Sequence, residues 1–179
     1  MTASPKCPLH AALQLLGDRW SLIVLRDIIF EQRRNYRALL KNSAEGIATN
    51  ILSDRLKKLS AAGLLTRAQN ADDQNRVIYS LSEEAIQLLP VICELGLWGR
   101  NLVEPRAEMR LRLLLLVGGG AKLQHQIMEE LRAIHLNGQD LTSQTTGLAR
   151  LNQAVARNLA GQGPIDLEIA LPDVRSTEP

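Results

Sequence analysis

The chain has 179 residues, of which 45% are hydrophobic and 22% are charged. This length suits one ordinary domain with an appendage or two very small domains, and the apolar content excludes wholesale disorder because it is enough to form a core. The formal net charge of +2 is too small to indicate a nucleic-acid-binding protein by itself.

The distribution of the charge is more informative than its sum. Residues 33–67 contain eight Lys or Arg and two acids, whereas residues 100–179 contain nine of each sign. Such a local excess of positive charge is typical of a surface that binds nucleic acid. The N-terminal residues lack the apolar run of a signal peptide, and the longest apolar stretch, residues 113–117, is far shorter than the ~20 residues of a membrane span. We therefore expect a cytoplasmic protein with no membrane contact.

The first three predicted elements are helices with recognisable ends. Pro8 suits the first position of a helix over residues 8–16, which Gly17 ends. Asp18 is placed to cap a second helix over residues 19–30, which is apolar almost all round and therefore buried. Asn35 is placed to cap a short third helix over residues 36–41.

A turn then leads to a helix over residues 48–62, closed by Gly63. Leu52, Leu56 and Leu59 recur at helical spacing and form its buried stripe. At about 100° per residue, the side opposite this stripe is polar. This side carries Asn50, Asp54, Lys57 and Ala61 and is flanked by Ser53 and Lys58.

After Gly63 the periodicity changes from helical to alternating, which predicts a two-stranded hairpin with its second strand near residues 76–82. Ser82 is placed to cap a helix that runs to about Trp98 and is kinked at Pro90, because proline lacks a backbone donor. Beyond residue 99 we expect helices over residues 105–117, 121–136 and 145–159, with a break at the glycines 118–120 and an irregular end from residue 161. Their predicted core comprises Leu111, Leu113, Leu116, Ile127, Met128 and Leu131.

The order helix, short helix, turn, helix, hairpin is that of a winged helix-turn-helix. The segments "CPLHAALQLLGDRWSLIVLRDI", "NYRALL", "EGIATNILSDRLKKLSAAGLLTR" and "VIYSLSEEAIQLLPV", with the closing Trp98-Gly99, resemble the HxlR family of bacterial transcriptional regulators, which are relatives of MarR. The resemblance covers residues 7–99. It implies a homodimer formed through the first helix and the helix ending near Trp98, which binds a pseudo-palindromic operator with the helix at residues 48–62 as its recognition helix.

The predicted fold is therefore mainly α with a small β-hairpin. Residues 1–99 are expected to form a winged helix-turn-helix domain for DNA binding and dimerisation, and residues 100–179 a helical C-terminal extension that widens the dimer interface or forms an effector pocket.

Two features depart from the family pattern. Ala48 stands where many relatives have a capping serine, and the wing tip is Asp72-Asp73 instead of proline-rich. Carboxylates repel phosphates, so Arg76 at the base of the second strand is the better backbone contact.

An amphipathic helix is most often an ordinary surface helix, but the local charge, the hairpin and the resemblance favour DNA contact here. Asp54 only accepts hydrogen bonds and would select a cytosine amino group or orient a neighbouring side chain, while Arg55 is expected to brace the fold. Thr49, Asn50, Ser53 and Lys57 are the predicted donors to bases or phosphates. Arg33, Arg34 and Lys58 are the predicted phosphate clamps, which position the protein without reading sequence.

Cys7 has two interpretations. At the start of the first helix and beside Lys6, its thiol has the surroundings that favour a reactive thiolate, and some regulators in the HxlR family sense oxidants or electrophiles at this point. The alternative is a small apolar residue at the edge of the dimer. Cys93 is expected in the core, and a bridge between Cys7 and Cys93 of two subunits is a further alternative.

No catalytic, cofactor-binding or metal-binding pattern stands out. His10, His125 and His135 lack a second ligand one helical turn away, and the triple glycine lacks the context of a phosphate-binding loop. We therefore expect no enzyme activity, no cofactor and no metal. The sequence predicts a dimeric, DNA-binding repressor released by an oxidant or a small-molecule effector, and the alternative is a winged-helix protein–protein adaptor without DNA binding.

Overall fold

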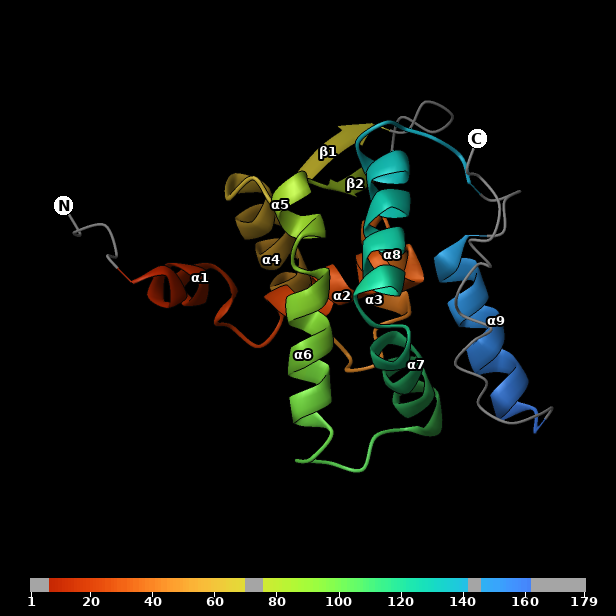
Figure 1. Ribbon diagram of the computed structural model, residues 1–179. Coiled ribbons are helices and arrows are strands. Elements are labelled where there is room, and N and C mark those ends of the chain that lie inside the picture. The colour runs from red at the N-terminus through yellow and green to blue at the C-terminus, as the bar shows by residue number, and fades with distance from the viewer. Residues whose placement is uncertain (1–6, 70–75, 142–145, 162–179) are drawn as a thin grey trace. The chain divides into compact units, whose positions relative to one another are not determined.

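The computed structural model describes residues 7–69, 76–141 and 146–161 and divides the chain into two compact units, residues 1–86 and 87–179. The first unit contains α1 (Pro8–Leu16), α2 (Ser21–Glu31), α3 (Tyr36–Lys41), α4 (Thr49–Ala61), β1 (Leu65–Gln69), β2 (Val77–Leu81) and α5 (Glu83–Ile86) (Figure 1). The second contains α6 (Leu89–Gly99), α7 (Ala107–Gly118), α8 (Gly120–His135) and α9 (Gly147–Leu159). The expected fold class, mainly helical with one small hairpin in a winged helix-turn-helix, is confirmed. The functional division at residue 99 stays a prediction.

The core of the first unit is built around α2. Its side chains Leu25, Ile28 and Ile29 are fully buried, as expected for a helix that is apolar almost all round. From α4, the predicted stripe of leucines packs into the same unit, and it is buried as its helical spacing requires. The opposite side of α4 is thereby left facing outward.

The predicted helix ends are confirmed for α1 and α3. In α3, the Asn35 side chain accepts a hydrogen bond from the Ala38 backbone amide at 2.9 Å. The second helix begins at Ser21 and not at Arg19, because Asp18 Oδ1 accepts from the backbone amides of Trp20 and Ser21, both at 2.9 Å, and holds the preceding residues in a turn. Gly63 ends the α4 segment with a φ of 73°, a left-handed conformation that glycine adopts without strain.

The two strands form the predicted antiparallel hairpin, with Leu65 opposite Leu81 and Gln69 opposite Val77. Its buried ends are Leu65 and Leu81. The hairpin is also bonded to the segment between α2 and α3, since the Tyr79 amide donates to the Arg34 carbonyl at 2.7 Å. The wing is thus fixed to the helix-turn-helix by backbone as well as by packing.

The single kinked helix expected between Ser82 and Trp98 is wrong. Ser82 Oγ does accept from the Ala85 amide at 3.3 Å, but α5 ends at Ile86 and α6 begins at Leu89. Pro90 lies in the first turn of α6, where its missing amide removes no helical hydrogen bond. The proline therefore marks the start of a new helix instead of a kink.

The second unit is held by leucine-rich faces of α7, α8 and α9. The predicted Leu116, Ile127 and Leu131 are buried, while Leu111, Leu113 and Met128 are half-buried. The prediction omitted other fully buried residues, among them Leu115, Leu123 and Leu151. The glycine run breaks the helix as predicted, since Gly119 lies between α7 and α8 and Gly120, the first residue of α8, has a φ of 56°. In the described part of the chain, no helix is both long and apolar enough to cross a membrane.

Candidate nucleic-acid interface

The turn between α3 and α4 is closed by side-chain hydrogen bonds. Ser43 Oγ accepts from the Ile47 amide at 3.1 Å, and Ile47 itself is buried. At the start of α4, the Tyr36 hydroxyl donates to the Thr49 carbonyl at 3.1 Å. These contacts join α3 to the N-terminus of α4, which gives the pair the defined geometry that a helix-turn-helix needs.

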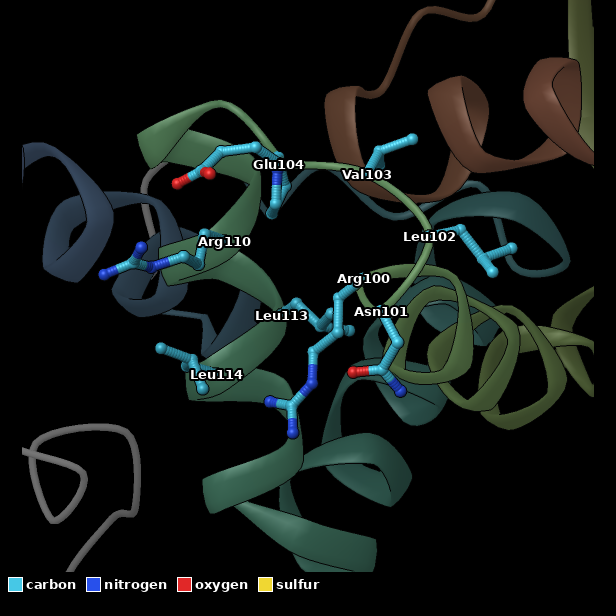
Figure 2. Close-up of a pocket in the computed structure, with 9 residues that line it drawn as sticks. Arg100, Asn101, Leu102, Val103, Glu104, Arg110, Leu113 and Leu114 are labelled. Atoms are coloured by element: carbon cyan, nitrogen blue, oxygen red, sulfur yellow. The ribbon is translucent and has the colours of Figure 1, made fainter.

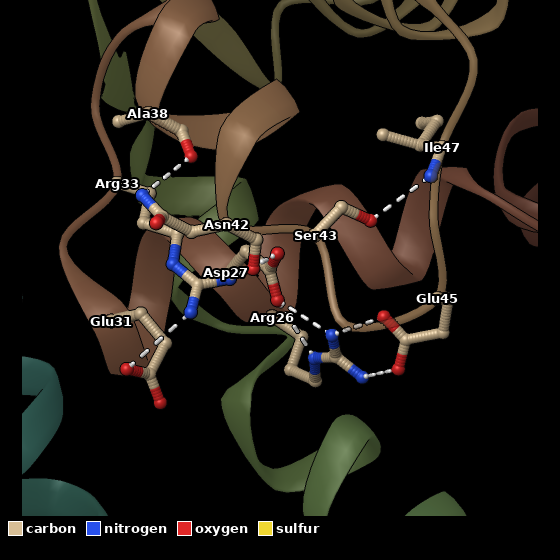
Figure 3. Close-up of polar contacts among 9 residues, drawn as sticks. All are labelled: Arg26, Asp27, Glu31, Arg33, Ala38, Asn42, Ser43, Glu45 and Ile47. Atoms are coloured by element: carbon tan, nitrogen blue, oxygen red, sulfur yellow. Dashed lines mark hydrogen bonds and ion pairs between the residues drawn. The ribbon is translucent and has the colours of Figure 1, made fainter.

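A network of charged side chains ties this turn to α2 (Figure 3). Arg26 donates two hydrogen bonds to the Glu45 carboxylate, at 2.7 and 2.9 Å, and also contacts Asp27 at 2.6 Å. Arg33 Nη1 reaches the other oxygen of Asp27 at 2.9 Å and the Asn42 carbonyl at 2.6 Å. Asp27 is the centre of the network, with a side chain that is only 5% exposed. Because charge-assisted hydrogen bonds are directional, a carboxylate buried between two arginines restricts both the orientation of the turn and its distance from α2.

The electrostatics of Arg26 follow from these contacts. Burial alone would lower the pKa of its guanidinium, but the hydrogen bond with Glu45 and the charge of Asp27 raise the pKa above its ordinary value. Arg26 is therefore a permanent cation that serves the fold.

The outward side of α4 carries the predicted contacts. Thr49, Asn50, Asp54 and Lys57 are exposed, and Ser53 is half-buried. Across residues 7–69, 76–141 and 146–161, the side chains of Asn50, Ser53 and Lys57 form no hydrogen bond or ion pair with the protein. Their donors and acceptors are available to another molecule. This is the largest set of predicted site residues that the structure brings together.

The predicted clamps Arg33 and Arg34 point to acceptors of the protein itself. Arg33 belongs to the Asp27 network. Arg34 Nε donates to the Tyr79 carbonyl at 3.3 Å, and Arg34 Nη2 donates to Ser80 Oγ at 2.5 Å. Burial lowers the pKa of Arg34. Both arginines hold elements together, so a phosphate contact would be an additional role.

Lys58 and Arg55 share one partner, Asp18 in the turn before α2. Lys58 Nζ donates to Asp18 Oδ2 at 3.0 Å, and Arg55 Nη1 lies 2.7 Å from the same oxygen. Arg55 also pairs with Asp54. Arg55 therefore braces the fold, as the sequence predicted, and Lys58 does so as well.

In the wing, Arg76 is exposed and immediately precedes β2. The wing-tip residues Asp72 and Asp73 lie outside the described residues. Sequence reasoning missed four other exposed cations among the described residues of this unit: Arg19 before α2, which lies over the Trp20 ring, Arg37 and Lys41 on α3, and Arg67 on β1. Arg37 and Lys41 are four residues apart on one helix, a spacing that places both on one side and could have identified them.

The two cysteines occupy different environments. Cys7 is exposed and is the N-cap residue of α1, where its carbonyl accepts from the Ala11 amide at 3.0 Å. Cys93 is buried, and burial raises the pKa of its thiol to about 11. Among the described residues, no cluster of three or more His, Cys, Asp or Glu is arranged to hold a metal ion.

Comparison with known proteins agrees with this geometry. The family model for HxlR-like helix-turn-helix proteins matches residues 15–107. The HTH-type transcriptional regulator Mb3122 of Mycobacterium bovis is 38% identical over 97 residues, which are 54% of this chain and 59% of that protein. YdzF, an HTH-type transcriptional regulator of Bacillus subtilis, is 32% identical over 96 residues, which are 54% of this chain and 87% of YdzF.

Among solved structures, the crystal structure of PA1607, described as a transcription factor, superposes with a TM-score of 0.52 and 26% identity, and covers 57% of this chain and 69% of PA1607. The present chain thus spans less than two thirds of Mb3122 and more than four fifths of YdzF. Both relatives are named as HTH-type transcriptional regulators. The chain therefore belongs to the HxlR-like helix-turn-helix family and has the DNA-binding fold of a transcriptional regulator.

Proposed function

We propose that the protein is a homodimeric, sequence-specific repressor that acts on cytoplasmic DNA and is released by an oxidant or a small-molecule effector. Each protomer would insert α4 into a major groove, and the two copies of α4 would lie about 34–36 Å apart, one turn of the double helix. A dimer bound in this way would block RNA polymerase by steric exclusion.

The observation that carries the proposal is the outward side of α4. Its side chains Asn50, Ser53 and Lys57 have no partner among the described residues, although neighbouring cations on the same helix are held by Asp18. Asn50 and Ser53 offer donors and acceptors suited to base edges, and Lys57 supplies a cation for a guanine edge or a phosphate. Thr49 and Asp54 would complete the base-reading set, and Arg76 would contact the backbone from the wing.

Dimer formation is supported by apolar side chains that the described residues leave uncovered. In α1, Leu9 and Leu13 are four residues apart and are 66% and 56% exposed. In α6, Val91, Leu95 and Trp98 follow one another at helical spacing and are all exposed. Contiguous apolar faces of this kind are typical of protein–protein interfaces. A second copy of the chain is the partner that the family resemblance implies.

Two features support release by an effector. Cys7 is exposed at the start of α1, within reach of an oxidant. In the second unit, the segment between α6 and α7 borders an open hollow of about 620 Å³ whose lining includes Leu113, Leu114, Arg100, Arg110 and the carboxylate of Glu104 (Figure 2). This volume is in the range of small-molecule sites, and the mixture of leucines and arginines suits an anion with an apolar body.

The proposal is tested by fluorescence anisotropy with the DNA upstream of the gene and with random DNA, at several salt concentrations. We expect the upstream DNA to bind more tightly, with a salt slope of about −0.9 per phosphate contact. The Lys57→Ala, Arg76→Ala double variant should lose most of this affinity. A matched control, Arg106→Ala with Lys122→Ala, removes the same charge from exposed positions of the second unit and should bind as the wild type does.

Equal weak binding to both DNAs, unchanged in the Lys57/Arg76 variant, would contradict the proposal and favour the adaptor alternative. Repetition with hydrogen peroxide, beside a Cys7→Ser variant, tests the oxidant. Release of the wild type but not of Cys7→Ser is the expected result.

A further inference from the structure

Five donors converge on the carboxylate of Asp18, in the turn between α1 and α2. Its Oδ1 accepts from the backbone amides of Trp20 and Ser21, both at 2.9 Å. Its Oδ2 accepts from Ser21 Oγ at 2.5 Å and from Lys58 Nζ at 3.0 Å, and it lies 2.7 Å from Arg55 Nη1. One carboxylate therefore satisfies a helix N-terminus and two cations of the recognition helix α4.

The same donors would suit a phosphate group. Backbone amides at the start of a helix, a hydroxyl, a lysine and an arginine are the usual ligands of phosphate oxygens in proteins. Burial raises the pKa of Asp18, but the hydrogen bonds from Ser21, Trp20 and Lys58 outweigh it and hold this pKa well below its usual range. Asp18 is thus a permanent anion in a place that fits a phosphate.

This cluster lies at the surface. The side chains of Asp18, Arg55 and Lys58 are 25%, 19% and 32% exposed. Arg55 and Lys58 are three residues apart on one flank of α4, beside the outward residues Asp54 and Lys57. If α4 enters a major groove, this flank faces the phosphates that border the groove.

We propose that Asp18 determines the specificity of DNA binding by acting as an internal substitute for phosphate, which holds Arg55 and Lys58 away from the DNA backbone. The inference rests on the proposed function, since it concerns how α4 meets DNA. A phosphate contact strengthens binding to every sequence equally, whereas base contacts alone distinguish the operator. By occupying these two cations, Asp18 lowers the affinity for random DNA and keeps α4 in one orientation for base contacts.

The test is the Asp18→Asn variant in the full chain, titrated with random duplex DNA and with upstream DNA at several salt concentrations. For random DNA, we expect affinity to rise roughly three- to tenfold at low salt and the slope of log K against log salt to steepen by about 1–2 per bound protomer. The preference for upstream DNA should fall. A residue that only stabilised the fold would weaken all binding when replaced, so a gain for random DNA is diagnostic.

Three controls accompany this variant. Glu84→Gln makes the same charge change at an exposed position on α5 and should leave both affinities unchanged. Ser21→Ala removes one hydrogen bond to Asp18 but keeps its ion pairs, and should lower thermal stability without strengthening random binding. Adding Lys58→Gln to Asp18→Asn should remove much of the gain.

The Lys58→Gln single variant gives an answer even if Asp18→Asn does not fold. Because Asp18 already holds Lys58 in an ion pair, the Lys58→Gln variant should bind random DNA with the same slope of log K against log salt as the wild type. A slope shallower by about 0.9 would overturn the inference, because Lys58 would then be a phosphate contact. Unchanged random binding in folded Asp18→Asn would also overturn it and leave the proposed function intact. If the wild type binds neither DNA, the proposed function and this inference both fail.

Discussion

The two units of the chain are stabilised in different ways. In residues 1–86, charged side chains from distant parts of the sequence meet in the interior or at its edge, as in the Asp27 network and the Asp18 cluster. In residues 87–179, α7, α8 and α9 are joined mainly by apolar side chains, together with a buried cation, Arg112 of α7, which donates to Asn152 Oδ1 of α9 at 2.6 Å. Their polar contacts include the Glu130 carboxylate, which accepts from the Leu148 amide at 3.0 Å at the start of α9.

The difference indicates what each unit has to do. Apolar packing supplies free energy but is not directional, so related packings differ little in energy. Ion pairs and hydrogen bonds add little net stability but restrict orientation. Under the proposed function, the first unit must hold α4 in one orientation to read bases, and its charges would serve that purpose. The roles proposed for the second unit, an apolar dimer face on α6 and a hollow for an effector, need a stable helical body more than one fixed orientation of a base-reading helix.

The largest effect on stability should come from Leu131→Ala in α8. Leu131 is fully buried, and a Leu→Ala cavity costs about 2–5 kcal/mol. We expect this loss in chemical denaturation of the second unit, followed by the fluorescence of Trp98 in a Trp20→Phe background. Leu136→Ala, at an exposed position after the same helix, should cost less than about 0.5 kcal/mol. DNA affinity of the folded Leu131→Ala protein should be unchanged, and a large change would break the comparison between the units.

Compared with Leu131→Ala, Asp27→Asn should lower the free energy of unfolding somewhat less and the affinity for upstream DNA much more. Removing one partner of a buried ion pair costs about 3–5 kcal/mol, and because both arginines here are 21% exposed we expect about 2–3 kcal/mol. The turn between α3 and α4 would then keep its direct contact from Arg26 to Glu45 but lose the carboxylate that orients both Arg26 and Arg33, so the affinity for upstream DNA should fall in the folded protein. Denaturation followed by Trp20 and anisotropy measure the two effects. Glu31→Gln, which neutralises the more exposed carboxylate 3.9 Å from Arg33, should cost less than about 1 kcal/mol.

If Asp27→Asn lost stability but bound upstream DNA as the wild type does, the charges of the first unit would not be setting the orientation of α4. The two units would then differ only in the residue types that stabilise them, and not in what those residues do.

Sequence reasoning succeeded where the determining residue is local. Pro8, Asn35 and Gly63 act on their immediate neighbours, and they fixed the ends of α1, α3 and α4 to within a residue. The break between α5 and α6 was missed because a proline is compatible with a kink or with a first turn, and tertiary packing decides between them.

The candidate site was predictable only in part, for the same reason. The outward side of α4 follows from periodicity, so its exposed residues were identified. The partners of the cations were not, because Lys58 meets Asp18 across 40 positions and Arg34 meets Ser80 across 46. No local pattern reveals which cation a folded chain uses internally and which it leaves for a ligand.

The smallest effect concerns the two thiols, and it separates the units chemically. Burial raises the pKa of the Cys93 thiol from 9.0 to about 11, so at pH 8 folded Cys93 is protonated and inaccessible, whereas Cys7 is exposed. Iodoacetamide should therefore modify Cys7 quickly in the wild type. In the Cys7→Ser variant, it should modify no thiol until the second unit opens and exposes Cys93. Since the folded pKa exceeds the unfolded one, Cys93 favours the folded state below pH 9, and this contribution should be lost as the pH rises from about 9 to about 11.

Leu131→Ala should accelerate Cys93 modification because it weakens the unit that buries this thiol, whereas Asp27→Asn should not. Equal acceleration by both would mean that the two units open together and that their different stabilisation does not make them independent.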